Sequence, residues 1–145
     1  MALVEKSVLV EYSAAQMYAL VENVAAYPEF LPWCGGTEIL WREGDVTRAA
    51  ITIDFRGIKQ RFSTENHAHP PQLIEMTLID GPFRQLDGSW RFKALGDEAC
   101  KIEFRLHYEF SSKLLEKIFG PVFHYIASTF VEAFVKRARQ LYGNR

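Results

Sequence analysis

Ten consecutive residues in the last third of the chain alternate strictly between apolar and polar side chains. In the segment KIEFRLHYEF, residues 101–110, every second residue is large and apolar, and those between are charged or histidine. This alternation predicts a β-strand with one face buried and the other in water. Strands of this kind belong to antiparallel sheets with one wet face. The segment therefore predicts such a sheet.

Six further segments have the same period and complete the predicted sheet. They cover residues 8–12, 37–41, 45–55, 58–68, 73–79 and 84–95. Arg56-Gly57 is expected to form the tight turn of a hairpin, because glycine tolerates the positive φ that such turns need. Between the first two strands, Ser13 and Gln16 have the spacing of a capping box, which predicts a helix through about Glu22.

From Ser112 to about Tyr142 the period becomes helical. Gly120-Pro121 is expected to kink or restart this helix, because proline lacks an amide and clashes with the preceding turn. Projection at about 100° per residue places one apolar stripe toward the sheet: Leu115, Ile118, Phe119, Val122, Ile126, Phe130 and Ala133. The predicted fold class is α+β, a curved antiparallel sheet of about seven strands around a long C-terminal helix, with residues 1–145 forming a single domain.

Composition excludes several classes of function. With 17 Lys and Arg against 18 Asp and Glu, the net charge is −1, whereas domains that bind nucleic acid through its phosphates are strongly basic, so direct DNA binding is not expected. The two cysteines are too few for a disulfide scaffold and match no zinc-ligand spacing. The N-terminal segment lacks the apolar run of a signal peptide, so a cytoplasmic location is expected.

An apolar loop is the least expected feature of the sequence. Residues 27–34, YPEFLPWC, contain four large apolar side chains, and two prolines prevent an ordinary helix. One reading is that these side chains close the open end of an apolar gap between sheet and helix, where an apolar ligand binds. The alternative is a solid core with the loop packed at the edge of the sheet.

Several polar residues are weighed as candidate site residues. Arg137 projects into the apolar stripe, so it either reaches solvent or pairs with an acid such as Asp54, or else it donates hydrogen bonds to the polar head of a ligand. His67 and His69 share a strand face but lack a third nearby metal ligand, so no metal site is expected. Cys34 is expected to act as a small apolar filler, and no catalytic residue is predicted.

The far side of the last helical turns is a candidate partner surface. Apolar side chains project away from the predicted core stripe and are interrupted by charges, with Arg145 nearby. A contiguous surface of this kind indicates a partner or dimer contact, although single exposed apolar side chains are ordinary. The proposed surface consists of Val131, Val135, Lys136, Arg139 and Tyr142.

Four motifs together resemble one known family. YPEFLPWC, DGPFRQLDGSWRF, ACKIEF and the closing FGPVF…VEAFVKRARQLY are similar to the coenzyme Q-binding START-domain family. The likeness extends especially to its bacterial branch of ribosome-association toxins, also described as oligoketide cyclase/lipid transport proteins. The resemblance implies a helix-grip (START/Bet v 1-like) fold and a single lipid-binding domain without catalytic apparatus. Pro121 departs from the polar residue expected in the toxin-like branch.

The resemblance also implies a ligand, which is ubiquinone or another prenyl lipid rather than a tightly held cofactor. A lid role is carried over to the residues of the loop, and Arg137 matches the arginine of the family's C-terminal segment. The ligand-binding residues expected from the stripe, the strands and this likeness are Tyr27, Phe30, Leu31, Pro32, Trp33, Cys34, Phe83, Trp90, Phe104, Phe119, Phe123, Ile126, Phe130 and Arg137.

Two functions of different classes are therefore expected. The first is a non-enzymatic lipid carrier that supports respiration, with transient contact at the inner membrane. The second is a module that docks on the large ribosomal subunit and blocks subunit joining. A polyketide cyclase or aromatase comes third, because it rests on fold analogy alone.

Overall fold

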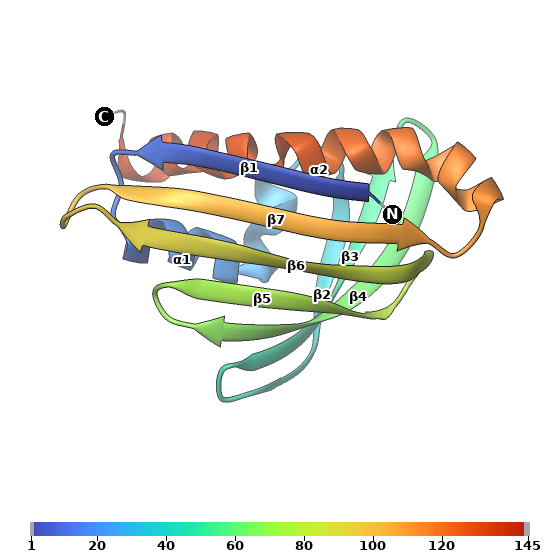
Figure 1. Cartoon of the computed structure of the whole chain (residues 1–145), viewed down its shortest axis with the longest axis horizontal. Coiled ribbons are helices and arrows are strands. Elements are labelled where there is room, and N and C mark those ends of the chain that lie inside the picture. The colour runs from blue at the N-terminus through green and yellow to red at the C-terminus, as the bar shows by residue number, and fades with distance from the viewer. Residues whose placement is uncertain (1, 144–145) are drawn as a thin grey trace.

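The computed structural model describes residues 2–143 and has the predicted α+β helix-grip architecture. Seven strands form one sheet, and a long helix follows the last strand (Figure 1). In chain order the elements are β1 (Ala2–Val10), α1 (Ala14–Glu22), the 3-10 helix η1 (Val24–Glu29), β2 (Cys34–Glu43), β3 (Val46–Phe55), β4 (Ile58–His69), β5 (Leu73–Asp80), β6 (Phe83–Ala94), β7 (Cys100–Phe110) and α2 (Lys113–Tyr142).

The sheet is antiparallel throughout, in the order β1-β7-β6-β5-β4-β3-β2. Each strand from β2 to β7 pairs with the next in the chain, and β1 then pairs with β7 at one edge. In Figure 1 strands β1, β7, β6 and β5 lie in front and β2–β4 turn behind them, so the sheet curves around an interior. Helix α2 runs along one side of this interior, and α1 lies behind the front strands.

Local sequence signals decide where several elements begin and end. The capping box is present: the Ser13 side chain accepts a hydrogen bond from the Gln16 amide, and the Gln16 side chain accepts one from the Ser13 amide. At the β3–β4 turn both Arg56 and Gly57 have positive φ, of 54° and 78°. Two positive φ angles are typical of the type I′ hairpin turn, whose twist matches that of the strands.

The predicted restart of the long helix at Gly120-Pro121 is wrong, since α2 continues through Pro121 without interruption. Its first turns do run at an angle to the remainder (Figure 1). Pro121 is exposed, so the backbone carbonyl one turn earlier, which loses its amide partner, is close to solvent.

The predicted apolar stripe of α2 is rotated from the observed one. Ile118, expected inside, is 56% exposed, whereas Val131, expected on the far side, is 4% exposed. The helix packs against β7 and also against β1 and α1, so its buried arc is displaced toward that second flank. The buried positions are Phe119, Phe123, Ile126, Ala127, Val131, Phe134 and Ala138.

One glycine, Gly88 of β6, lets three neighbouring strands approach each other closely. A Cβ placed on Gly88 in β6 would lie 2.7 Å from the backbone oxygen of Arg105, 2.9 Å from Leu106 and 3.2 Å from the end of Met76. Real Cβ atoms essentially never approach backbone oxygens so closely. The strands β5, β6 and β7 could not keep this spacing around a larger side chain.

We expect Gly88→Ala to lower the free energy of unfolding by about 1–3 kcal/mol, the usual cost of overpacking. Gly36→Ala is the matched control, because a Cβ there meets nothing within 4 Å, and it should change stability by about 0.5 kcal/mol or less. Urea denaturation of both variants measures the difference. Equal stability of the two would show that the strands can separate at no cost.

Candidate functional site

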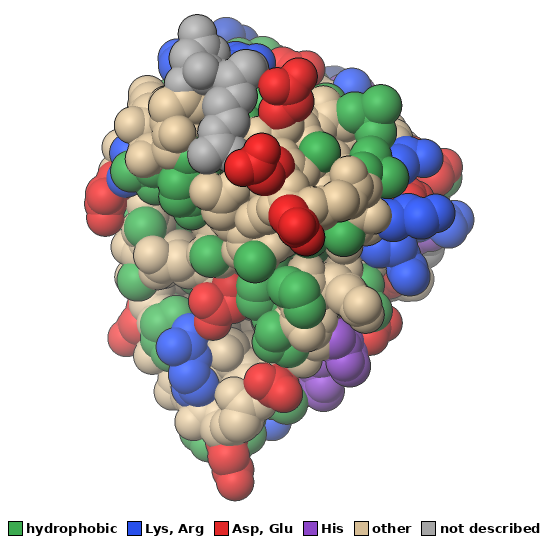
Figure 2. Space-filling view, turned by 90° about the vertical axis from the view of Figure 1, so that its left-hand side faces the viewer, with side chains coloured by type: hydrophobic (Ala, Val, Ile, Leu, Met, Phe, Trp, Pro, Cys, Tyr) green, Lys and Arg blue, Asp and Glu red, His purple; other side chains and the backbone are tan. Residues whose placement is uncertain are grey.

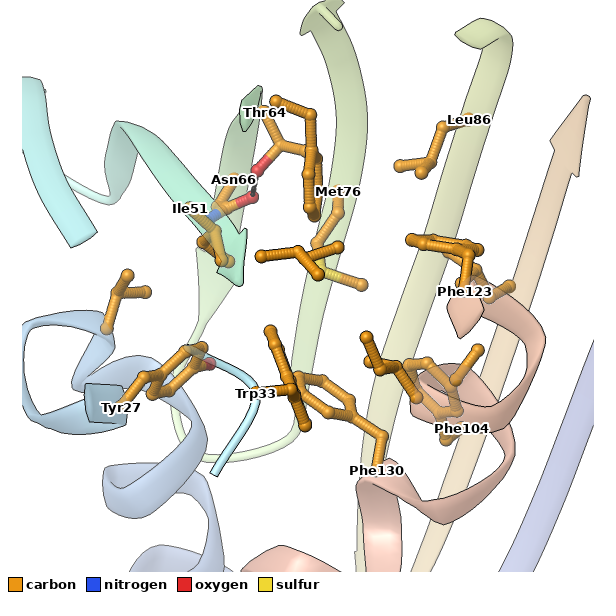
Figure 3. Close-up of a pocket in the computed structure, with 16 residues that line it drawn as sticks. Tyr27, Trp33, Ile51, Thr64, Asn66, Met76, Leu86, Phe104, Phe123 and Phe130 are labelled. Carbon is orange, nitrogen blue, oxygen red and sulfur yellow. Dashed lines mark hydrogen bonds between the residues drawn. The ribbon is translucent and has the colours of Figure 1, made fainter. Parts of the chain in front are cut away.

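A small apolar cavity of about 70 Å³ lies between the sheet and α2. Its wall combines side chains from η1 and the following loop, from β3 to β7, and from the middle of α2 (Figure 3). The lining residues are Val24, Tyr27, Trp33, Ile51, Ile53, Phe62, Thr64, Asn66, Met76, Leu86, Phe104, Leu106, Phe123, Ile126, Ala127 and Phe130.

The apolar segment at residues 27–34 closes one side of this cavity; it was expected to be a loop, but it begins inside η1, which contains Pro28, and ends at the first residue of β2. The Tyr27 hydroxyl donates a hydrogen bond to the Val21 carbonyl, and the Asp54 amide donates one to the Trp33 carbonyl at 2.8 Å. The Trp33 and Tyr27 rings each pack against Phe130, with centroids 5.8 and 6.3 Å apart. A side-chain hydrogen bond to α1 and a backbone hydrogen bond to β3 therefore hold these aromatic rings over the interior.

Two polar side chains interrupt the apolar wall. The Thr64 hydroxyl donates a hydrogen bond to the Asn66 side-chain oxygen at 2.8 Å, as Figure 3 shows. Both residues lie on β4, and Thr64 is 5% exposed. A polar pair in such a wall could orient the polar end of a ligand.

The cavity offers little for acid–base catalysis. Among the described residues, none of those that line it is Asp, Glu, His, Lys or Arg. Tyr27 is the titratable group in the wall, and its burial raises the pKa of its phenol well above the ordinary value. Its hydroxyl therefore stays protonated across the physiological range and cannot serve as a general base.

The volume of the cavity limits what it holds in this conformation. An apolar cavity that binds benzene measures about 150 Å³, and pockets for drug-sized molecules exceed about 300 Å³. At about 70 Å³, the space admits a few methyl groups. A prenyl lipid or a quinone ring requires the surrounding aromatic rings to move apart.

A second hollow of about 360 Å³ adjoins the cavity and is more polar. The two share Val24, Tyr27, Asn66 and Met76 as lining residues. Glu22 of α1 and Arg42 of β2, which also line the second hollow, form an ion pair of 3.8 Å. This hollow, between α1 and the strands β2 to β5, is the natural mouth of the cavity.

The hydroxyl of Tyr18 at this mouth is buried and has no hydrogen-bond partner in the described structure. Burial, together with the charges of Glu22 and Asp45, raises the pKa of this phenol. An unpaired buried hydroxyl is costly, and it is free to bind a polar ligand group here.

Arg137 does not face the cavity. Its side chain is 18% exposed and lies in a separate outer groove of about 540 Å³, between the apolar loop and the second half of α2. There its guanidinium pairs with Glu29 at 2.9 Å and lies over the ring of Phe30 at 5.2 Å. The acid that it meets is thus Glu29 rather than the suggested Asp54, because η1 places Glu29 beside the end of α2.

The structure divides the predicted ligand residues into three groups. Six line the cavity: Tyr27, Trp33, Phe104, Phe123, Ile126 and Phe130. Three line only the outer groove, namely Phe30, Pro32 and Arg137, and Trp33 lines both spaces. The other five do not line either space: Leu31, Phe83, Trp90 and Phe119 are 1–5% exposed, and Cys34 is half-buried.

Leu31 and Trp90 show why sequence reasoning placed too many aromatic and apolar residues at the site. Each is 1% exposed and belongs to the packed core, so a charged residue at position 31 would disturb folding rather than only the ligand site. The residues that were missed lie mostly on the inner faces of β3 to β6. Their alternation was visible in the sequence, but alternation identifies a buried face and not a void.

The predicted partner surface is not continuous in the structure. Val131 is buried, and the Tyr142 hydroxyl donates a hydrogen bond to the Gln16 carbonyl while its ring packs against Tyr12. Both positions therefore belong to the buried side of α2, and Tyr142 packs toward the start of α1. Val135 is half-buried, Lys136 and Arg139 remain exposed, and Arg145 lies outside the described residues. On the end where α2 finishes, acidic, basic and hydrophobic side chains are interspersed (Figure 2).

The histidine and cysteine candidates have ordinary surroundings. His67 and His69 pair with Glu65 and Glu75, at 2.8 and 3.3 Å. Within residues 2–143 no group of three potential metal ligands occurs. Burial raises the pKa of the Cys34 thiol, which keeps it protonated and poorly nucleophilic at neutral pH.

We expect Phe130→Ala to enlarge the cavity and to lower the free energy of unfolding by about 3–5 kcal/mol. The Phe130 ring contacts the rings of Tyr27, Trp33, Trp90, Phe104 and Phe134. Thr129→Ala, at the next position, should cost about 1 kcal/mol or less. Urea denaturation with and without benzene tests this, since benzene should stabilise only the enlarged variant. Unchanged stability of Phe130→Ala would contradict the packing described above.

Comparison with known proteins places this fold and site in context. The chain is 46% identical over 140 residues to the ribosome association toxin RatA of Vibrio cholerae, covering 97% of each chain. It is 29% identical over 144 residues to the coenzyme Q-binding protein COQ10 homolog B of Xenopus laevis, covering 97% of this chain and 59% of that protein. The crystal structure of Zhui aromatase/cyclase from Streptomyces sp. R1128 superposes with a TM-score of 0.85 at 15% identity, covering 96% and 94% of the two chains. A family model matches residues 10–135, and the chain thus belongs to the polyketide cyclase/dehydrase and lipid transport family.

Proposed function

We propose that this protein is a ribosome-association factor that docks on the large ribosomal subunit and acts without catalysis. The observation that carries this proposal is the 46% identity, over nearly the whole of both chains, to a ribosome association toxin. Identity of this extent over nearly the full length indicates a shared fold and supports a related role. A cytoplasmic location follows from the same proposal.

The interior of the protein is consistent with this assignment. The cavity is small, and its lining lacks a general acid or base among the described residues. Docking through the protein surface does not depend on this cavity. The aromatase/cyclase neighbour is 15% identical, which supports a common fold and carries no catalytic role to this chain.

The docking surface is expected to include the exposed cations of the last turns of α2. Of the residues predicted for the partner surface, Lys136 and Arg139 are exposed on α2, whereas Val131 is buried and Tyr142 is half-buried. They lie three residues apart and therefore project on one side of the helix. The net charge of −1 favours a contact with ribosomal protein together with a few phosphates over a contact with phosphates alone.

Sedimentation with purified bacterial ribosomal particles tests the proposal. The wild-type protein should sediment with large subunits and not with small subunits. The double variant Lys136→Glu, Arg139→Glu should bind about tenfold more weakly, because reversed charges at an interface oppose association. Arg91→Glu, Lys93→Glu is the matched control, since these two cations are exposed on the outer face of β6.

A wild-type protein that sediments with none of the particles would overturn the proposal. Unchanged binding of the Lys136→Glu, Arg139→Glu variant would leave ribosome association standing and would exclude the end of α2 as its surface.

A second function, the binding of an apolar ligand such as ubiquinone, is favoured by a separate observation. The apolar cavity shares four lining residues with a more polar mouth, an arrangement suited to a molecule with an apolar end and a polar end. The similarity to a coenzyme Q-binding protein adds support. Each CH₂ group of a prenyl chain that is buried in the cavity would contribute about 0.8 kcal/mol to the free energy of binding. This gain favours a conformation in which the Trp33 and Phe130 rings separate to admit the chain.

We expect organic extracts of protein purified without detergent to contain a stoichiometric prenyl lipid, measured by mass spectrometry. Ala127→Leu fills the cavity, because Ala127 lines it and is 4% exposed, and should reduce the bound lipid severalfold. Ala133→Leu, on the same helix and facing the outer groove, should keep it. A clean extract from the wild type, with added ubiquinone also failing to bind, would exclude the ligand while leaving ribosome association untouched.

A further inference from the structure

A row of exposed apolar side chains lies on the first half of α2. Leu114, Ile118 and Tyr125 are 66, 56 and 47% exposed, and Pro121 between them is also exposed. Their spacing of four, three and four residues places them on one side of the helix. We call these four residues the exposed stripe. It begins at the start of α2, and its last residue, Tyr125, lines the outer groove together with Lys136.

The tip of the β3–β4 hairpin extends the exposed stripe sideways. The rings of Phe55 and Tyr125 stack with centroids 5.9 Å apart and planes within 6°. The guanidinium of Arg56 lies over both rings, at 4.8 and 5.5 Å from their centroids. The helix and the hairpin thus present one apolar surface with a cation at its edge.

The charges beside the exposed stripe are mainly positive. Lys113 and Lys117 each directly precede a stripe residue and are one helical turn apart, so they flank it on one side, and Arg56 flanks it on the other. Two acids, Glu116 and Glu109, line a hollow beside Pro121 at the edge of the stripe, and Glu109 is paired with Arg84 at 3.5 Å. Asp54 lies on the neighbouring strand directly opposite Lys59, which offsets its charge. Farther along the same side, Glu132 comes seven residues after Tyr125 and is followed by Lys136.

The position of these lysines is not explained by helix stability. Lys113 is the first residue of α2, where the helix macrodipole disfavours a positive charge. The exposed large apolar side chains beside it also gain nothing from water. The lysines and the exposed apolar side chains both become favourable if this surface contacts an apolar layer whose boundary is negatively charged.

We propose that the exposed stripe, with Phe55, Arg56, Lys113 and Lys117, docks this protein on the surface of an anionic lipid bilayer. Apolar side chains on one helix face with cations along their edges are typical of helices that lie in the membrane interface. Each Lys or Arg close to such a surface strengthens binding through the negative potential of the lipid headgroups.

Other occupants fit this surface less well. A second copy of the chain would cover the apolar side chains, but both copies would bring their excess of cations to one interface. Nucleic acid would satisfy the cations but would leave Leu114 and Ile118 against a polar backbone. An anionic membrane satisfies both the apolar and the charged part.

Vesicle flotation with the purified full-length chain tests this proposal. Vesicles of phosphatidylcholine with about one quarter phosphatidylglycerol should carry the protein to the top of the gradient, and pure phosphatidylcholine vesicles should carry about tenfold less. Ile118→Glu and the double variant Lys113→Glu, Lys117→Glu should each reduce flotation about tenfold or more. Added salt should weaken binding of the wild type.

Leu141→Glu provides the matched control, because Leu141 is a 52% exposed leucine on the same helix but near its other end. This variant should float like the wild type, and circular dichroism should show that all variants remain folded. The proposal is overturned if the wild type does not float with anionic vesicles. It is also overturned if Ile118→Glu floats normally, or if light scattering shows that the stripe instead joins two copies.

Discussion

The concave face of the curved sheet must be covered, and the aromatic face of α2 covers it. Phe119, Phe123 and Phe134 are each 0–3% exposed and insert between rings that project from β6 and β7. Burial of one such ring stabilises the fold by about 1.5–3 kcal/mol, and edge-to-face contacts between rings add to this. Without the helix, the apolar inner face of the sheet would be exposed to water.

The cavity is the part of the interior that these side chains do not fill. Toward the start of α2 the rings of Phe83, Phe110, Phe119 and Phe123 fill the interior, whereas in the middle Ala127 is too small to do so. The loop at residues 27–34 then closes the remaining space with Tyr27 and Trp33. The loop is apolar because it forms the wall of an interior, and only part of that wall faces a void.

The two proposed functions use different parts of the molecule. Lipid binding depends on the interior and requires aromatic side chains to move, whereas ribosome association depends on exposed charges at the end of α2. The membrane surface that we propose lies at the other end of that helix. The sheet and α2 separate the internal ligand site from both docking surfaces, whereas the two docking surfaces adjoin, since Phe55 and Tyr125 line the same outer groove as Lys136.

The local pattern of the sequence determined the elements of this protein. Alternation identified seven strands, although the first was predicted at residues 8–12 and β1 spans Ala2–Val10. The Ser13–Gln16 box and the Arg56-Gly57 turn placed a helix start and a hairpin, because these depend on neighbouring residues alone. The four motifs determined the family. Tertiary structure decided the rotation of α2, which buried Val131 and exposed Ile118, since a helix covered by both a sheet and a second helix has a displaced buried arc. It also decided that Arg137 meets Glu29, and that the cavity is small, because both depend on how side chains distant in sequence fill a shared space.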